Sequence, residues 1–286
     1  MRRTVPAYVL RCCLLAVCAS SSGVALADNT DPEVSPALDR VSLWLGAYDA
    51  HTSTTVSAGL NNVDVKGHIN LQNDLGFPSR KVEPRVRFDF LLGESQGFSF
   101  DYYRVDQSRT RTLSTAIGFN GNTFDASASV TGRVNFDFGS AAYKWWFGHG
   151  SDVFGLGVGA AYYRVHAGIS GEATLSGPFI GQASAYASTS TTHSAWAPDL
   201  QLGWRHAFTN NLRMYLNASG VKKNGNHLGG HIYDAALGVE WFPWRNIGFG
   251  AEYDYTRIHI HQGHHTYNDE LAMRMDGPSV FLRLRF

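Results

Sequence analysis

Cysteine is almost missing from this sequence. The chain has three cysteines, Cys12, Cys13 and Cys18, and all of them lie within the first 27 residues. A protein that loses those residues on export has no disulfide and no thiol chemistry.

Those first 27 residues have the features of a secretory signal peptide. The basic pair Arg2-Arg3 precedes an apolar stretch, and Ala25-Leu26-Ala27 forms an A-x-A cleavage site. We expect cleavage before Asp28. A lipoprotein signal is the alternative, because Leu15-Ala16-Val17-Cys18 is similar to a lipobox, although Val17 stands where a small residue is usual.

The rest of the chain also lacks long apolar runs and an excess of basic residues. No stretch of about 18 or more uncharged apolar residues follows residue 27, which excludes a transmembrane helix. Removal of Arg2, Arg3 and Arg11 leaves 21 basic against 24 acidic residues, and this charge argues against a nucleic-acid partner. A closed β-barrel is the other structure that satisfies every backbone group within lipid.

Alternation of apolar and polar residues is the dominant pattern after residue 40. In a strand this period places the two classes on opposite faces. Residues 28–40, with two prolines and several acids, predict a short periplasmic lead, and residues 41–286 predict the barrel. Ten segments alternate, near 41–51, 84–92, 98–103, 133–145, 154–162, 196–205, 212–218, 233–241, 247–255 and 278–286.

Two of these segments are less regular. The facing of the first is ambiguous. The fourth has Val134, Phe136 and Phe138 on its apolar face, and the phase then slips near Gly139, which predicts a β-bulge there.

The connections form a second pattern. Four short ones, at 93–97, 148–152, 209–211 and 243–246, alternate with five long ones, at 52–82, 105–130, 167–192, 221–230 and 261–276. Tight periplasmic turns and long outer loops alternate in this way in outer-membrane barrels. We therefore predict an all-β, antiparallel, up-and-down transmembrane β-barrel of ten strands, with eight or twelve as alternatives. Hairpins are expected at Asn120-Gly121 and Gly177-Pro178.

Aromatic residues gather at the ends of the segments, where membrane interfaces favour them. The short-turn end has Trp44, Trp145, Trp146, Trp204, Trp241 and Trp244, and the long-loop end has Tyr102, Tyr162, Tyr233, Tyr253 and Tyr255.

Two parts of the sequence resemble known membrane barrels. The alternating segment that ends in Phe286 resembles the C-terminal strand of bacterial outer-membrane β-barrels, whose final Phe the barrel assembly machinery recognises; Leu284 departs from the aromatic that is common there. Ile69–Gly76 and Tyr103–Leu113 resemble a loosely defined family of Gram-negative outer-membrane barrels without a settled activity. The resemblance implies the fold, location in the cell outer membrane, and contact with outer-membrane lipid and lipopolysaccharide. It transfers no functional residue.

Charged residues on the polar faces form the candidate site. The bases are Arg85, Arg87, Arg133, Lys144, Arg205, Arg213, Arg283 and Arg285, and the acids are Asp89, Asp101, Asp137, Asp199, Asp234, Glu240, Glu252 and Asp254. Unpaired buried charge is costly, so these groups should pair in a narrow lumen. They predict either a salt-bridged polar plug or a narrow water path. Arg283 and Arg285 are expected to pair near the periplasmic end, with Glu240 and Glu252 as candidates.

The histidines give no ligand set. His259, His261, His264 and His265 cluster beyond one strand, and His227 and His231 border the preceding loop. No acid stands at a tight ligand spacing, so we predict neither a metal nor a cofactor.

Catalysis has weak support in the sequence. His193-Ser194 with Asp199, and Asp49 with His51, are the local groups that a hydrolase could use, but neighbours in a strand face opposite sides. We expect a non-catalytic barrel, structural or narrow-pore, whose outer loops (173–194 among them) bind an unknown ligand or surface. The alternative is an outer-membrane hydrolase, lipid A-modifying or protease-like, with a rim site.

Overall fold

The structure is a computed structural model that describes residues 34–60, 66–73, 75–113, 117–119, 122–124, 128–177, 180–223, 228–263 and 267–286. It describes only the backbone for 56–60, 66–69, 117–119, 122–124, 173–177, 180–185, 193, 228, 262–263 and 267–269. The predicted signal peptide, its cleavage before Asp28 and the lipoprotein alternative lie outside the described residues. The described part contains no helix that could span a membrane.

Ten long strands form a closed antiparallel barrel. They are β1 (Val41–Leu60), β3 (Arg80–Leu92), β4 (Gln96–Thr112), β7 (Ser129–Phe147), β8 (Asp152–Gly177), β9 (Ile180–Ala207), β10 (Leu212–Lys223), β11 (Leu228–Trp241), β12 (Ile247–Gly263) and β13 (Tyr267–Arg285). Each pairs with the next along the chain, and β1 also pairs with β13, from Ser42 opposite Arg285 onward. The predicted ten-stranded barrel and its closing pair are confirmed.

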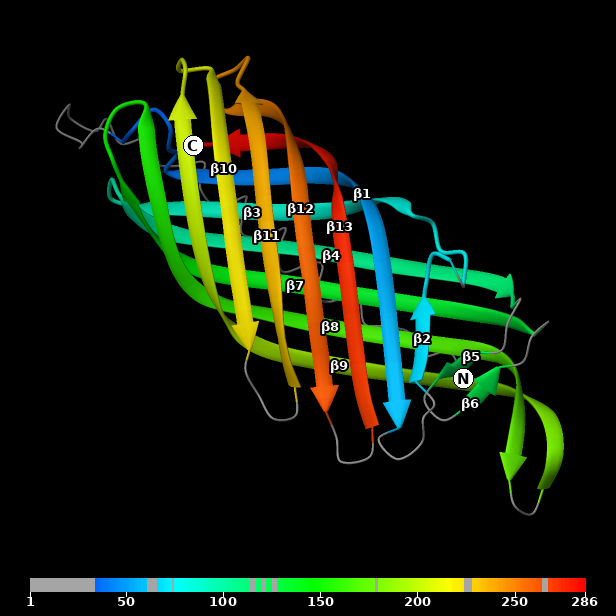
Figure 1. Ribbon diagram of the computed structural model, residues 1–286. Coiled ribbons are helices and arrows are strands. Elements are labelled where there is room, and N and C mark those ends of the chain that lie inside the picture. The colour runs from blue at the N-terminus through cyan, green and yellow to red at the C-terminus, as the bar shows by residue number, and fades with distance from the viewer. Residues whose placement is uncertain are drawn as a thin grey trace, which may run out of the picture. The chain divides into compact units, whose positions relative to one another are not determined.

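The two ends of the barrel differ, as the connection lengths predicted. Figure 1 shows the four tight turns and the C-terminus together at the upper left, with the long connections at the opposite end. Gly93 and Gly150 occupy turn positions with φ of 68° and 67°, a conformation that favours glycine. We call these ends the short-turn end and the long-loop end.

Strands continue well beyond the length that a bilayer needs. β8 and β9 have 26 and 28 residues, whereas about 9–11 span a membrane. Their pairing runs to Gly177 opposite Ile180, so the predicted hairpin there is confirmed. β5 (Ile117–Phe119) and β6 (Asn122–Phe124) form the other predicted hairpin, and β2 (Lys66–Asn70) pairs with β1.

Exposed apolar side chains cover the outside over a membrane-sized height. In β9, the span from Trp196 to Trp204 is nine residues long, and Leu200 and Leu202 within it are more than half exposed. In β12, Ile247 to Tyr255 gives the same length. A water-soluble protein rarely exposes so continuous an apolar band.

The predicted phase of the fourth segment is wrong. Burial alternates without a break along all of β7, and its pairing with β4 and β8 has no register shift. Val134, Phe136 and Phe138 therefore face inward, and no bulge occurs at Gly139. The assumption that apolar faces point to lipid fails here because the long-loop half of the interior is itself apolar.

The aromatic belts are only partly as predicted. Trp44 and Trp146 are 4% and 8% exposed and point into the barrel. Trp196 lies at the long-loop end, with its ring centroid 5.2 Å from that of Tyr162. Tryptophan and tyrosine are thus not strictly separated between the two ends.

Candidate functional site

An ion-pair cluster fills the middle of the lumen and is centred on Arg85. The Nε of Arg85 donates to Asp101 Oδ1 at 3.0 Å, and its Nη1 and Nη2 lie 2.9 Å from Asp254 and 3.2 Å from Asp234. These carboxylates come from β4, β12 and β11, so one guanidinium on β3 joins opposite walls of the barrel.

Arg87, one inward position along β3, extends this cluster. Its Nη1 donates to Glu252 at 2.8 Å and its Nη2 lies 3.2 Å from Asp254. Tyr215 Oη donates to the same Glu252 oxygen. Shared carboxylates of this kind hold each guanidinium in one orientation and reduce the cost of burying its charge.

A second cluster closes the short-turn end. Arg283 on β13 donates to Glu240 on β11, as predicted, and its Nη2 lies 3.2 Å from Asp39 Oδ2. Arg213 on β10 donates to Asp39 Oδ1 at 2.8 Å. Asp39 is therefore shared between two strands, and its side chain is only 4% exposed.

Asp89 connects the two clusters along β3. Arg205 on β9 donates to Asp89 Oδ2 at 3.0 Å, and Arg283 Nη2 lies 3.8 Å from the same oxygen. Ion pairs thus continue from mid-barrel to the short-turn end.

Aromatic rings fill the spaces between the charges. The guanidinium of Arg87 lies 4.6 Å from the centre of the Trp44 ring, and that of Arg205 lies 4.8 Å from the Trp146 ring. The Trp44 ring also covers Gly46, where a Cβ would stand 1.9 Å from the indole, so glycine is required there. Cation–π contacts of this type contribute about 0.5–2 kcal/mol each.

The long-loop half of the interior is filled mostly by apolar side chains, and the Lys81–Glu83 ion pair is a charged pair on its β3 wall. Phe136, Ile232, Ile258 and Met275 are at most 2% exposed. The same cluster includes Tyr48, Leu75, Phe77, Tyr103, Val105, Val130, Val134, Phe138, Tyr163, Val165, Ile169, Val221, Ile260, Leu271 and Met273. Side chains from opposite walls therefore pack across the barrel above the ion pairs.

The segment Val34–Arg40 crosses the opening at the short-turn end. Ser35 Oγ donates to the carbonyl of Gly150 at 2.6 Å, and the carbonyl of Arg40 accepts from Leu91 N at 2.7 Å. Ala37 and Leu38 pack with Trp146 and its neighbours. We call this segment the N-terminal plug. The predicted lead thus includes a buried part.

Several predicted members of the network lie elsewhere. Arg133 and Asp137 are on the outer face of β7, because that strand has no phase slip; Asp137 Oδ1 lies 3.5 Å from Arg104 there. Lys144 and Asp199 are inward, but they bond to Ser99 and Gln201 rather than to opposite charges. Arg285 lies 3.9 Å from Asp39, and Glu252 pairs with Arg87 instead of with the last strand.

The groups considered for catalysis do not converge within the part of the chain that the structure describes. His51 lies 4.0 Å from Asp276, and Asp49 lies 3.8 Å from Arg80, with the imidazole exposed. Ser194 is exposed, Asp199 is inside the lumen, and the side chain of His193 lies outside the described residues.

The histidines at the long-loop end come together in pairs. His231 and His259 stack with centroids 5.2 Å apart, and His259 Nε2 lies 3.5 Å from Glu270. No group of three His, Cys, Asp or Glu side chains that could hold a metal ion occurs among the described residues, while His227, His264 and His265 are outside them.

Sequence reasoning missed Asp39, Trp44, Trp146 and Tyr215. Asp39 precedes any alternating segment, so periodicity gave it no facing. The inward position of Trp44 could have been inferred, because Trp44 lies on the same strand face as Ser42 and Tyr48.

Comparison with protein-family models and with curated proteins gives no match. Among solved structures, the chain is similar to the outer membrane protease OmpT from Escherichia coli, with a TM-score of 0.52, 9% identity, and coverage of 91% of this chain and 100% of that one. The translocator domain of the autotransporter NalP from Neisseria meningitidis has a TM-score of 0.45 and 11% identity, with coverage of 86% of this chain and 88% of that one. The outer membrane protein OprG from Pseudomonas aeruginosa has a TM-score of 0.39 and 9% identity, with coverage of 88% of this chain and 100% of that one. The chain has the fold of the Gram-negative outer-membrane β-barrels, in a ten-stranded form.

Proposed function

We propose that this protein is a sealed, non-catalytic barrel of the outer membrane that supports a binding surface outside the cell. One observation carries the proposal: the interior is filled at three successive levels. The N-terminal plug closes the short-turn end, ion pairs fill the middle, and apolar side chains pack across the long-loop half. Small barrels filled by side chains act as packed cores rather than channels.

The exposed apolar band supports a membrane location. Its height matches a bilayer, and aromatic residues mark both of its edges. Just beyond the long-loop edge, Arg164 and Arg257 are exposed on the outer face. Their charges suit the phosphate groups of lipopolysaccharide, which is the lipid partner that we expect there.

The strand extensions support the binding part of the proposal. β8 and β9 together continue far beyond the band, and their paired backbones make a firm support for outer side chains. Tyr186 on β9 is 74% exposed there, and exposed tyrosines are common in binding surfaces. Loops and hairpins on a rigid scaffold often carry recognition.

Two assays test the location and the sealed state. The protein should fractionate with outer membranes and migrate faster in gels before heating than after. Liposomes that contain it should not swell in solutions of small sugars. Swelling at the rate given by an open porin would contradict the sealed state, and recovery in the soluble fraction would contradict the location.

A third assay tests the absence of catalysis. Purified protein should not hydrolyse peptides or lipid A esters above the rate of a variant with both His51→Ala and His193→Ala. Turnover by the parent protein that the variant lacks would support a hydrolase and overturn the non-catalytic proposal.

A further inference from the structure

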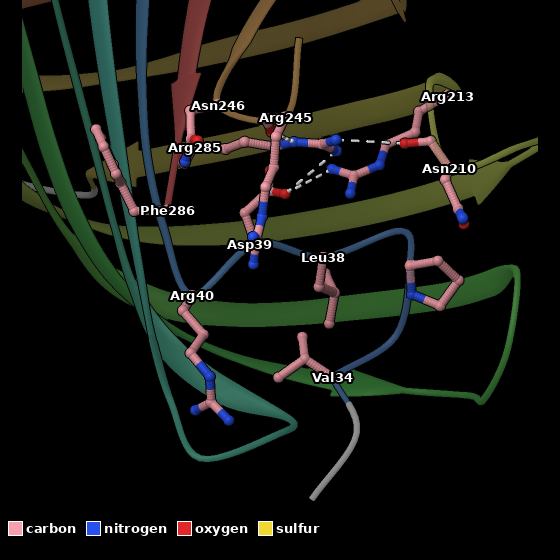
Figure 2. Close-up of a pocket in the computed structure, with 11 residues that line it drawn as sticks. Val34, Leu38, Asp39, Arg40, Asn210, Arg213, Arg245, Asn246, Arg285 and Phe286 are labelled. Carbon is pink, nitrogen blue, oxygen red and sulfur yellow. Dashed lines mark hydrogen bonds and ion pairs between the residues drawn. The ribbon is translucent and has the colours of Figure 1, made fainter. Parts of the chain in front are cut away.

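A cavity of about 280 Å³ lies at the short-turn end, between the N-terminal plug and the ends of β10, β12 and β13. Four arginines line it, Arg40, Arg213, Arg245 and Arg285, together with one acidic side chain, Asp39, and the last residue, Phe286. Figure 2 shows the side chains of Arg213 and Arg285 extended side by side in this cavity, with Arg245 beside them. The cavity is thus lined by far more positive than negative side chains.

Asp39 is already shared between guanidinium groups. Asp39 bonds to Arg213 at 2.8 Å and lies 3.2 Å from Arg283, which places it between two guanidinium groups already. Arg285 is 3.9 Å away from it, at the limit of an ion pair. Since Arg283 also pairs with Glu240, the positive charge that has no close carboxylate here belongs to Arg245 and Arg285, and it favours an anion.

Arg285 is held in place by hydrogen bonds, while Arg213 and Arg245 keep donors without a partner among the described residues. Arg285 donates its Nε to the carbonyl of Arg245 at 2.7 Å and its Nη2 to the carbonyl of Asn210 at 3.3 Å, and it packs 3.7 Å from the centre of the Phe242 ring. Arg213 is only 6% exposed, yet its Nε has no hydrogen-bond partner among the described residues. Arg245 is exposed, and no described residue accepts from its side chain. Oriented guanidinium donors are suited to bidentate recognition of phosphate.

The position of the cavity indicates where such a phosphate comes from. Trp241 and Trp244, both more than half exposed, mark the membrane interface on the same turn that carries Arg245. Lipid phosphates lie at this depth. Val34, Pro36 and Leu38 add an apolar wall on the other side, which suits the alkyl part of a lipid.

We propose that this cavity binds a phosphate group, supplied by the headgroup of an anionic phospholipid in the periplasmic leaflet. Arg245 and Arg285 contact the phosphate oxygens, and Arg213 fixes the inner side of the site through Asp39. A lipid held there would also lie against the N-terminal plug and keep it in the barrel mouth. The site is independent of whether the outer strands bind a partner.

The test uses the full protein in a phosphate-free detergent solution. Short-chain phosphatidylglycerol, short-chain phosphatidylcholine and inorganic phosphate are titrated separately, and bound molecules are counted by native mass spectrometry. We expect saturable binding of phosphatidylglycerol, at least tenfold tighter than that of phosphatidylcholine. Arg245→Gln should weaken it at least tenfold, and Arg245→Lys should weaken it less, since a lysine keeps the charge but loses the bidentate geometry.

A matched control is Arg109→Gln, an exposed arginine on β4 at the long-loop end. It should bind phosphatidylglycerol like the parent. Because Arg245 is exposed, its replacement should leave the barrel folded, and the heat-dependent gel shift verifies this. Equal affinity for inorganic phosphate would support the phosphate site with a soluble source. Absence of saturable binding, or binding that Arg245→Gln leaves unchanged, would overturn the proposal.

Discussion

Arg283 Nη2 on the last strand lies 3.2 Å from Asp39 Oδ2 in the segment before the first strand. This ion pair lies inside the barrel, beside the seam where β1 and β13 close the sheet. The N-terminal plug is therefore ion-paired with β13, the strand that closes the barrel against β1.

Replacement of Asp39 should destabilise the barrel strongly. Asp39→Asn leaves Arg213 and Arg283 without their shared carboxylate at a buried site, and loss of one partner of a buried pair costs about 3–5 kcal/mol. The free energy of unfolding can be measured by urea titration in lipid vesicles. Asp106→Asn is the control, because its carboxylate is half exposed and 3.8 Å from Arg104, and such surface pairs contribute about 1 kcal/mol or less. Equal losses in the two variants would show that Asp39 does not hold the plug.

The facing of β7 can be tested by single-cysteine labelling. A chain that begins at Asp28 has no cysteine, so one introduced at position 133 or 136 is the only reactive thiol. Arg133→Cys should react with a membrane-impermeant maleimide, because Arg133 is exposed, and Phe136→Cys should not, because Phe136 is 0% exposed. The opposite result would restore the phase slip at Gly139.

Protonation of His231 should occur at lower pH than for an ordinary histidine. Burial lowers its pKa, and the neighbouring His259 lowers it further. His231 lies outside the membrane band, two residues before Tyr233 on the long-loop side of β11. Because the pKa of His231 is lower in the folded state, folding favours its neutral form. The stacked pair is therefore fully stabilised above about pH 6.5, and its stability decreases as the pH falls below that value. An NMR titration should give a midpoint for His231 below pH 6.5, and His259→Ala should raise that midpoint. A midpoint that does not move would rule out the coupling.

The number of strands, the short turns and the closing pair were predictable because they depend on local patterns, whereas the strand ends on the long-loop side were not, since β8 and β9 continue through the connection expected at 167–192. Alternation fixes which residues share a face, and turn residues fix where the chain reverses. Glu240 and Glu252 could be named in advance as candidate partners of Arg283, since they lie on inward faces, and Glu240 is the one that pairs with it. These features follow from the order of residues along each strand and do not depend on what fills the lumen.

The content of the lumen was less predictable, because facing depends on what lies on each side of the wall. Phe136 and Phe138 were interpreted as lipid-facing since lipid is apolar, but the interior at their height is apolar too. Trp44 was placed in an interface belt, although Gly46 leaves room for its ring inside. The buried position of Asp39 could not be predicted, because it depends on the segment before the first strand entering the mouth of the barrel. No periodic pattern in the sequence indicates this.

The most direct test of a sealed barrel is conductance across a planar bilayer. The parent protein should give no current steps above the lipid background. A variant with Trp44, Trp146 and Phe136 replaced by alanine removes large side chains at three levels of the lumen and should give small steps, which shows that the assay detects an opening. Regular steps from the folded parent protein would contradict the sealed interior and would establish a pore instead.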